Sequence, residues 1–392
     1  MKFKIFSDVY PPSFIRLCLG ALLFFLSFNI VLPELSTMLN ELNGYDYLGW
    51  IIPAFSISAL VARPLSGWLT DNVGRRWTMI AGCVFCIVAG FFYPFVSSVG
   101  GFLLVRIIHG FSTGFTPTGF TAFTSDVIPA SHRGRAMGWQ GVFNNAGTSL
   151  GYGLGAVIAL KFGRDAMFLT SSVLAVFALM LFYSLPETKP AESKRKFEFS
   201  WKNLIYIPAL SPGIIMWIVC ISLGTILTVM PDYTLSLGYE NKGLYLSWYI
   251  GFSLLFRLVS GKVSDALGRA WSTAIGTFLQ ILAMFALVKG GSSFYFFASA
   301  ILYGIGQGFN APSLFAWAGD VAGPENRGKS LATLFIFLEL GIITGGLLAG
   351  AMITRWQQSY ENIFLINGLS FVVAFGLSVY FIFKGRFQKS QY

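Results

Sequence analysis

Residues 63–76 read RPLSGWLTDNVGRR, and residues 257–269, which begin 194 positions later, read RLVSGKVSDALGR. Six of the residues in the first stretch recur at the same spacing in the second. The same offset relates Gly110 to Gly304, Asp126 to Asp320 and Gly147 to Gly341. One half of the chain therefore duplicates the other, and duplicated halves are typical of membrane transporters that bind substrate between two repeats.

The composition indicates a membrane protein. The chain is 55% hydrophobic and only 11% charged, whereas soluble domains carry roughly 25% charged residues. Apolar runs such as 79–95, 167–185 and 364–383 approach or reach the roughly 20 residues that cross a bilayer as a helix. Parsing the chain by such runs predicts about twelve membrane-spanning helices, centred near residues 25, 57, 88, 112, 149, 176, 223, 254, 282, 305, 342 and 372. Their backbones must be helical because lipid offers no hydrogen bonds.

A polar stretch near the middle of the chain separates two sets of six helices. It contains Pro186-Glu187-Thr188-Lys189-Pro190 and the basic cluster 194–196, which is the composition of a linker. The sequence therefore predicts an N-terminal six-helix bundle over 1–185, a cytoplasmic linker over 186–208 and a C-terminal six-helix bundle over 209–392.

The placement of Lys and Arg predicts the orientation. Eighteen of them fall in the termini, the central linker and the even-numbered loops, against five on the opposite side. The positive-inside rule then places both termini and the linker in the cytoplasm. The net charge of +10 is an orientation signal, and we expect no nucleic-acid partner, because the charges are dispersed among short loops.

The sequence predicts no metal site and no cofactor. Cys83 and Cys86 have CxxC spacing, but no other Cys or His cluster accompanies them, and all four cysteines fall in apolar runs. They are interpreted as packed or lipid-facing thiols. No GxxxxGK[ST] sequence is present, so we expect no direct use of ATP.

The sequence quoted at the start resembles the signature of a known family. The stretch Gly67-Trp68-Leu69-Thr70-Asp71-Asn72-Val73-Gly74-Arg75-Arg76 resembles the signature between helices two and three of the major facilitator superfamily, with Asn72 in place of the usual Arg, and residues 261–269 form a degenerate second copy. The resemblance implies twelve transmembrane helices in two six-helix bundles, an all-α membrane protein. It also implies a conformational latch, formed in the first copy by Gly67, Asp71, Gly74 and Arg75 with Asp126 from the end of helix four, and in the second by Asp265, Gly268 and Arg269. Gly67 and Gly74 would permit close helix approach and a tight turn. The alternative is that these charges only anchor the loops at the headgroups.

Three residues are candidates for proton coupling. The stretch 103–110, LLVRIIHG, resembles the helix-four motif of the superfamily, whose Arg is implicated in proton coupling; here that residue is Arg106. His109 follows three residues later and could titrate near neutral pH. Glu339 lies inside the eleventh predicted helix, where a carboxyl could bind and release a proton. The repeat counterparts of Arg106 and Glu339 are Ala300 and Asn145, so neither charge is needed by both halves for folding. The alternatives are a snorkelling Arg, a hydrogen-bonded packing His and a Glu that is paired for stability.

Helix five carries Gly147-Thr148-Ser149-Leu150-Gly151-Tyr152-Gly153-Leu154-Gly155-Ala156. It resembles the helix-five motif of the drug-efflux branch, with Tyr152 where Pro is usual, and its small residues at every fourth position predict close packing against helix eight. Helices one, four, seven and ten of such folds line the substrate cavity. The polar residues expected there or on helix five are Asn29, Asn144, Thr225, Gln307 and Asn310.

These features predict a secondary active transporter, not an enzyme, that exports a small, moderately hydrophobic or zwitterionic molecule in exchange for protons. It would work by alternating access as a monomer among the lipids of a bacterial inner (plasma) membrane. The near alternative is an uptake symporter or facilitator for a sugar or organic acid, which the altered helix-five motif favours. An intramembrane enzyme would need clustered acids, histidines or a metal motif, and a channel would need a repeated filter loop; the sequence shows neither.

Overall fold

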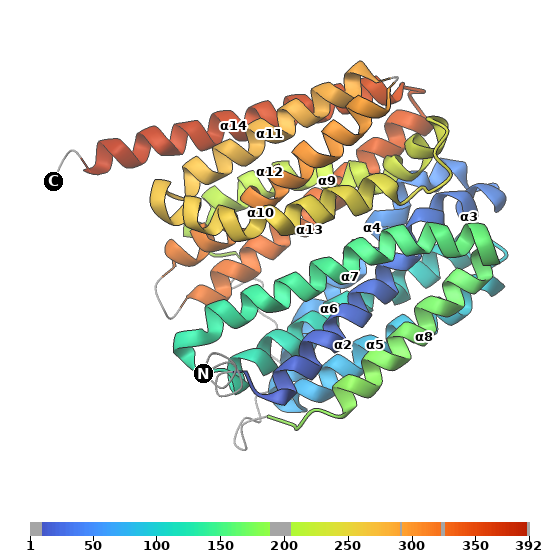
Figure 1. The fold of residues 1–392 in the computed structure, drawn as a ribbon, viewed down its shortest axis with the longest axis horizontal. Helices are drawn as coiled ribbons and strands as arrows, with labels where there is room; N and C mark the ends of the chain where they lie inside the picture. The colour runs from blue at the N-terminus through green and yellow to red at the C-terminus, as the bar shows by residue number, and fades with distance from the viewer. Residues whose placement is uncertain (1–9, 189–204, 291, 323–325, 390–392) are drawn as a thin grey trace. The chain divides into compact units, whose positions relative to one another are not determined.

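A computed structural model describes residues 10–188, 205–290, 292–322 and 326–389, and these residues form helices and short connections, with no strand (Figure 1). The first half contains α2 (Pro12–Ile30), η1 (Leu32–Glu34), α3 (Leu35–Glu41), η2 (Tyr45–Trp50), α4 (Ile51–Asn72), α5 (Arg75–Phe92), η3 (Tyr93–Phe95), α6 (Val99–Val127), η4 (Ala130–His132), α7 (Arg133–Phe162) and α8 (Arg164–Tyr183). The second half contains η6 (Ile207–Ala209), α9 (Leu210–Ser236), α10 (Leu244–Leu267), α11 (Arg269–Lys289), α12 (Ser293–Asp320), α13 (Arg327–Thr354) and α14 (Tyr360–Lys389).

The helices match the predicted spans. Within the described ranges, nine helices are long and apolar enough to cross a bilayer, and α10 makes ten if it is one span. The first span joins α2, η1 and α3 over Pro12–Glu41. Adding α7 and α12, which are 30 and 28 residues long but richer in Gly and polar residues, gives the twelve expected. The prediction of an all-α membrane protein is confirmed. Residues 189–204 of the predicted linker lie outside the described residues.

The described residues divide into two compact units. Unit 1 lies within Met1–Gly44, Ala54–Phe199 and Glu240–Gly243, and unit 2 within Tyr45–Pro53, Ser200–Tyr239 and Leu244–Tyr392. Each unit thus holds six long helices and takes one short segment from the other half of the sequence.

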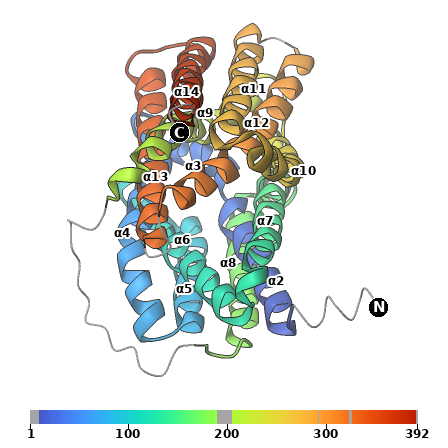
Figure 2. The ribbon, with the colours of Figure 1, turned by 90° about the vertical axis from the view of Figure 1, so that its left-hand side faces the viewer.

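Glycines set the helix packing in unit 1. A Cβ on Gly110 of α6 would lie 2.2 Å from the Phe55 carbonyl oxygen of α4, and one on Gly155 of α7 would lie 2.0 Å from the Ile30 carbonyl oxygen of α2. The helices α2 and α7 accordingly run side by side in Figure 1, as α5 and α6 do in Figure 2. Backbone approach of this kind allows van der Waals packing where lipid supplies no hydrophobic drive.

The same contacts recur in unit 2. A Cβ on Gly304 of α12 would lie 2.3 Å from the Tyr249 carbonyl oxygen of α10, and one on Gly345 of α13 would lie 1.9 Å from the Ile221 carbonyl oxygen of α9. Gly304 and Tyr249 are displaced by 194 positions from Gly110 and Phe55. The duplication in the sequence is therefore a duplication of backbone contacts.

The predicted partner of the helix-five glycines is wrong. The atoms nearest to a Cβ on Gly147, Gly151 or Gly155 all belong to α2. The spacing of small residues indicates that a close helix contact exists, but it contains no information about which helix is the partner.

Alanine at these contacts should destabilise the protein. Gly155→Ala and Gly345→Ala push a methyl group into backbone, and overpacking costs about 1–3 kcal/mol. Gly138→Ala in α7 and Gly328→Ala in α13 are matched controls, because a Cβ there meets no described residue within 4 Å and alanine gains roughly 0.5–1 kcal/mol of helix propensity over glycine. Thermal unfolding in detergent should show a lower Tm for the first pair only; equal Tm values in all four would contradict the packing argument.

Candidate functional site

The first copy of the latch is built around Arg75, the first residue of α5. Its Nε donates to Asp126 Oδ2 at 2.9 Å, its Nη1 donates to the Thr70 carbonyl at 2.7 Å, and Nη1 lies 3.6 Å from Asp71 Oδ1. The Arg75 side chain is only 10% exposed. The structure thus brings together the three charged residues that the sequence predicts, and Asp126 is a closer partner than Asp71.

Two residues that the sequence analysis did not assign to the latch complete this cluster. The Glu187 carboxylate accepts from the backbone N–H of Arg75 at 2.8 Å and of Arg76 at 3.2 Å, which places a negative charge at the positive end of α5. The Thr188 hydroxyl donates to Asp126 Oδ2 at 2.7 Å. A signal existed: α5 has no capping side chain and no acid in its first turn, so its N–H groups need an acceptor from elsewhere in the chain.

Gly74 leaves room for the Glu187 carboxylate to bind at the start of α5. Its φ is +148°, a region that residues with a side chain rarely adopt. A Cβ there would also lie 2.2 Å from Glu187 Oε2. Among the described residues a Cβ on Gly67 would meet nothing within 4 Å, so the close contact expected at both glycines is seen at Gly74 and not at Gly67.

The second copy of the latch repeats the ion pairs but not the docking. Arg269 Nε donates to Asp320 Oδ2 at 2.8 Å, and Nη1 pairs with Asp265. The Arg269 side chain is 25% exposed. A Cβ on Gly268 would meet nothing within 4 Å among the described residues, so the space that Glu187 fills in unit 1 has no counterpart occupant there.

Arg106 lies at the centre of a buried polar network in unit 1. It is 2% exposed, its guanidinium lies 4.7 Å from the centre of the Phe55 ring, and Nη1 donates to the Tyr93 hydroxyl at 3.4 Å. Stacking on an aromatic face stabilises a desolvated cation. The sequence analysis did not foresee Tyr93, because an aromatic residue at a helix end gives no signal of a buried hydrogen bond.

His109 extends this network away from Arg106. The Tyr93 oxygen, which accepts from Arg106, lies 3.3 Å from His109 Nδ1. The other ring nitrogen, Nε2, lies 3.4 Å from Cys86 Sγ. Both ring nitrogens of His109 therefore have a hydrogen-bond partner.

Glu339 lies in unit 2, within α13. It is 7% exposed and interacts electrostatically with Cys220 of α9. Two residues further on, Gly341 packs against the backbone of α9. The close approach of α9 and α13 therefore holds this carboxyl in a confined setting.

The five predicted cavity residues are divided between the units. Asn29 and Asn144 lie in unit 1; Thr225, Gln307 and Asn310 lie in unit 2. Asn310 Nδ2 donates to Gln280 Oε1 at 2.5 Å, and Gln280 donates to Gln307 Oε1 at 3.2 Å. Among the described residues, the side-chain oxygens of Asn144 and Asn310 are buried with no hydrogen-bond partner. The Asn310 oxygen packs against Gly276 of α11, so only Asn144 is left as a candidate to accept a hydrogen bond from a ligand.

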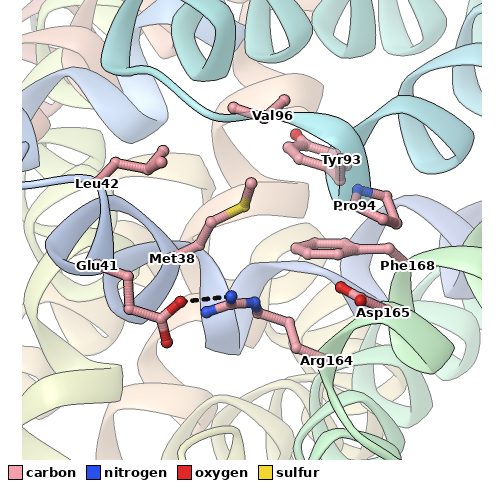
Figure 3. A pocket seen from close by; sticks show the side chains of 9 residues that line it. All are labelled: Met38, Glu41, Leu42, Tyr93, Pro94, Val96, Arg164, Asp165 and Phe168. Carbon is pink, nitrogen blue, oxygen red and sulfur yellow. Dashed lines mark hydrogen bonds and ion pairs between the residues drawn. The ribbon is translucent and has the colours of Figure 1, made fainter.

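Unit 1 also has a pocket that the sequence did not predict. It measures about 180 Å³ and lies between α3, η3 and the start of α8, with Met38, Tyr93 and Phe168 among its apolar walls (Figure 3). Glu41 and Arg164 form an ion pair at its edge. None of the predicted cavity residues lines it. Since α8 runs from this pocket towards the Glu187 cluster and has 20 residues, the two sites are about 30 Å apart.

Comparison with known proteins identifies relatives along nearly the whole chain. The sequence model of the Major Facilitator Superfamily matches residues 17–252 and 213–391. The quinolone resistance protein NorA of Staphylococcus aureus (strain MSSA476) is 25% identical over 349 residues, covering 84% of this chain and 87% of that protein. The staphylopine export protein of S. aureus (strain Mu50 / ATCC 700699) is 24% identical over 386 residues, covering 92% of this chain and 94% of that protein.

A solved structure shares the fold. The crystal structure of a D-xylose-proton symporter superposes with a TM-score of 0.78 at 18% identity, covering 94% of this chain and 97% of that one. At this identity the match supports the twelve-helix fold alone.

A double-variant cycle should show that Gly74 exists to admit Glu187. Gly74→Ala should destabilise the protein by more than the roughly 1–3 kcal/mol that a sparsely populated backbone region costs, since it also displaces the carboxylate. Gly268→Ala, the repeat counterpart, should show the backbone cost only. In a Glu187→Ala background, the Tm loss from Gly74→Ala should shrink to that of Gly268→Ala. Strict additivity of the two changes would refute the docking.

Proposed function

The chain belongs to the Major Facilitator Superfamily, and we propose that it is a proton-coupled exporter of small, moderately hydrophobic or zwitterionic molecules that works by alternating access. Its relatives include efflux transporters, and it is a multi-pass membrane transporter that is not an enzyme. The proposal adds the direction of transport, the coupling to protons and the residues that carry it.

Two buried intramembrane charges carry the proposal. Arg106 is 2% exposed and Glu339 is 7% exposed, and an ionised side chain inside a membrane costs at least about 2.5–3.5 kcal/mol. Both lie where the other repeat has an uncharged residue, Ala300 and Asn145. Because each buried charge is present in only one of the two repeats, a role in transport explains it better than a role in folding does.

Of the two titratable candidates, Glu339 suits the exchange of a proton better than His109. Both ring nitrogens of His109 are engaged by Tyr93 and Cys86, and Arg106 places a positive charge nearby. Glu339 belongs to the other unit, which does not contain Arg106. We therefore propose that Glu339 binds and releases the proton, and that His109 and Tyr93 hold Arg106 in position.

The names of the relatives support export. Quinolone resistance and staphylopine export are attributed to the two bacterial proteins that match most of this chain. The side-chain oxygen of Asn144, which has no hydrogen-bond partner among the described residues, favours a substrate that offers N–H or O–H donors. By the positive-inside rule we propose a bacterial plasma-membrane location with both termini in the cytoplasm, and the protein would act as a monomer.

The latch residues would control the facing of the transporter. Arg75 is held by Asp126, which is in turn held by Thr188, and Glu187 covers the helix start that carries Arg75. A change of conformation that moves any one of these elements must break several charge-assisted hydrogen bonds together. Such a cluster can favour one facing state over another.

Proton flux in proteoliposomes tests the proposal. Purified protein of known orientation is exposed to lipophilic cations, metal chelators, sugars and amino acids under an imposed pH gradient. Export by antiport predicts that substrate moves against protons. Movement of sugar or organic acid together with protons would support the uptake alternative, and transport without any pH change would overturn proton coupling.

Glu339→Gln should abolish substrate-driven proton flux while the protein remains folded, because the amide cannot take up a proton. Arg106→Lys should reduce transport by at least about tenfold, because lysine lacks the planar group that stacks on Phe55 and reaches Tyr93. Glu361→Gln, at the exposed start of α14, is the control and should transport normally. Normal coupling in Glu339→Gln would remove Glu339 from the mechanism.

Asp126→Asn should slow transport more than Asp71→Asn does. Asp126 receives a direct hydrogen bond from Arg75, whereas Asp71 lies 3.6 Å away and is 51% exposed, where ion pairs are worth little. Initial transport rates and Tm values of both variants measure this order. A larger defect in Asp71→Asn would contradict the geometry of the latch.

A further inference from the structure

A buried ion pair in unit 1 plays no part in the function described so far. The Lys242 ammonium donates to Glu34 Oε2 at 3.0 Å and to the Thr37 hydroxyl at 2.5 Å. Both charged side chains are 10% exposed. From sequence, Glu34 and Lys242 are ordinary charges near helix ends, yet the structure buries them together.

The first spanning segment changes from α-helix to a short 3-10 turn where Glu34 lies. Helix α2 ends at Ile30, the turn η1 carries Pro33, and α3 begins at Leu35. Proline removes a backbone donor and disrupts a continuous helix. The turn thus places the Glu34 carboxylate between the two α-helical parts of the span.

The conformation of segment 240–243 positions Lys242 beside Glu34. Asn241 Oδ1 accepts from the Gly243 N–H at 3.0 Å, which forms a tight turn around Lys242. Asn241 Nδ2 donates to the Gly153 carbonyl at 3.4 Å. A Cβ on Gly243 would lie 1.9 Å from the Tyr152 carbonyl oxygen of α7. Segment 240–243 is thus seated on unit 1, whereas the helices on either side of it, α9 and α10, belong to unit 2.

Few charges act on Glu34 besides Lys242. Thr37 shares its ammonium, and Tyr152 of α7 lies beside the seated segment. Farther along α3, Glu41 feels the charge of Lys242 but has its own partner, Arg164 of α8. Met38, one turn after Glu34, lines the pocket in Figure 3, which is large enough to hold several waters. The pocket therefore lies about one helical turn from Glu34.

We propose that Glu34 and Lys242 form a proton-sensitive clasp that is a second coupling element of the transporter. With Glu34 ionised, Lys242 holds segment 240–243 on unit 1. One proton from the medium neutralises the Glu34 carboxylate; the ammonium then loses its counter-charge in a buried place and moves to water, taking the segment with it. The clasp rests on the proposed proton coupling for its role in transport, but its release does not require substrate.

This step gives unit 2 a means of responding to protonation in unit 1. The chain on both sides of the released segment continues directly into α9 and α10. A buried carboxylate and ammonium stabilise each other only while both are charged, so neutralising one leaves an unpaired buried charge. The exposed Glu41–Arg164 pair, at 56% and 26% exposure, lacks this penalty because water can replace either partner.

Spin-label distances test the clasp directly. Labels at Glu240→Cys and Phe162→Cys place both probes on exposed positions of unit 1, and the four native cysteines are buried. Double electron–electron resonance between about pH 3 and about pH 9, a range that includes the pH at which ordinary carboxyl groups take up a proton, should show a short distance at alkaline pH and a growing longer-distance population at acid pH. Glu34→Gln should show the longer population throughout this range.

Two further variants keep the test decisive. Glu41→Gln, which removes a neighbouring carboxylate on the same helix, should keep the wild-type pH response. The exchanged pair Glu34→Lys with Lys242→Glu should restore the short distance at alkaline pH. A wild-type distance that does not change with pH, or a pH response that persists in Glu34→Gln, would overturn the clasp.

The outcome is separable from that of the proposed function. A pH-dependent distance in a protein that shows no substrate-driven proton flux would retain the clasp and reject proton-coupled export. Normal flux with an unchanging distance would reject the clasp and retain proton-coupled export.

Discussion

The structure depends on backbone-to-backbone contact between helices at glycine. In water, helices associate because apolar faces leave the solvent, but a bilayer is as apolar as the helix surface and removes that drive. Gly110, Gly155, Gly304 and Gly345 each place a helix against a neighbouring carbonyl oxygen, with no room for a Cβ. These contacts position α6 against α4 and α7 against α2 in unit 1, and so fix where Arg106 and Asn144 can point. Chemistry at those side chains follows from packing that glycine alone permits.

Packing and charge have followed different rules since the chain was duplicated. Packing glycines recur in both halves, as Gly110 with Gly304 and Gly151 with Gly345 do, although Gly155 has Ala349 as its counterpart, because each six-helix unit must solve the same problem of close approach. The buried charges are not retained. The repeat counterpart of Arg106 is Ala300, and that of Glu339 is Asn145. Burying a charge in a membrane is expensive, so a half that does not use one gains by losing it. Residues where the repeats disagree are therefore the better guide to function.

The sequence predicts what repeats or what is periodic. Apolar runs predict the helices, and the 194-residue offset predicts the paired latches, with Arg75 beside Asp126 and Arg269 beside Asp320. It fails for contacts between distant single residues. Nothing in the chain pairs Lys242 with Glu34, since neither has an equivalent partner pair in the repeat, and the glycines of α7 do not identify α2 as their partner. A contact like that of Glu187 could have been predicted in part, because the N–H groups at an uncapped helix start need an acceptor. The sequence does not identify which acid supplies it.

The latch and the clasp differ in how they must respond to the medium. The Arg75–Asp126 pair leaves Asp126 26% exposed and adds neutral donors from Thr188, so loss of one contact is partly compensated by water and by its neighbours. The Glu34–Lys242 pair is 10% exposed on both sides and rests on a single carboxylate. Salt screens the first more than the second, since screening acts through solvent. A surface cluster of many bonds suits a graded bias between conformations, whereas one buried pair suits a step that a single proton can trigger.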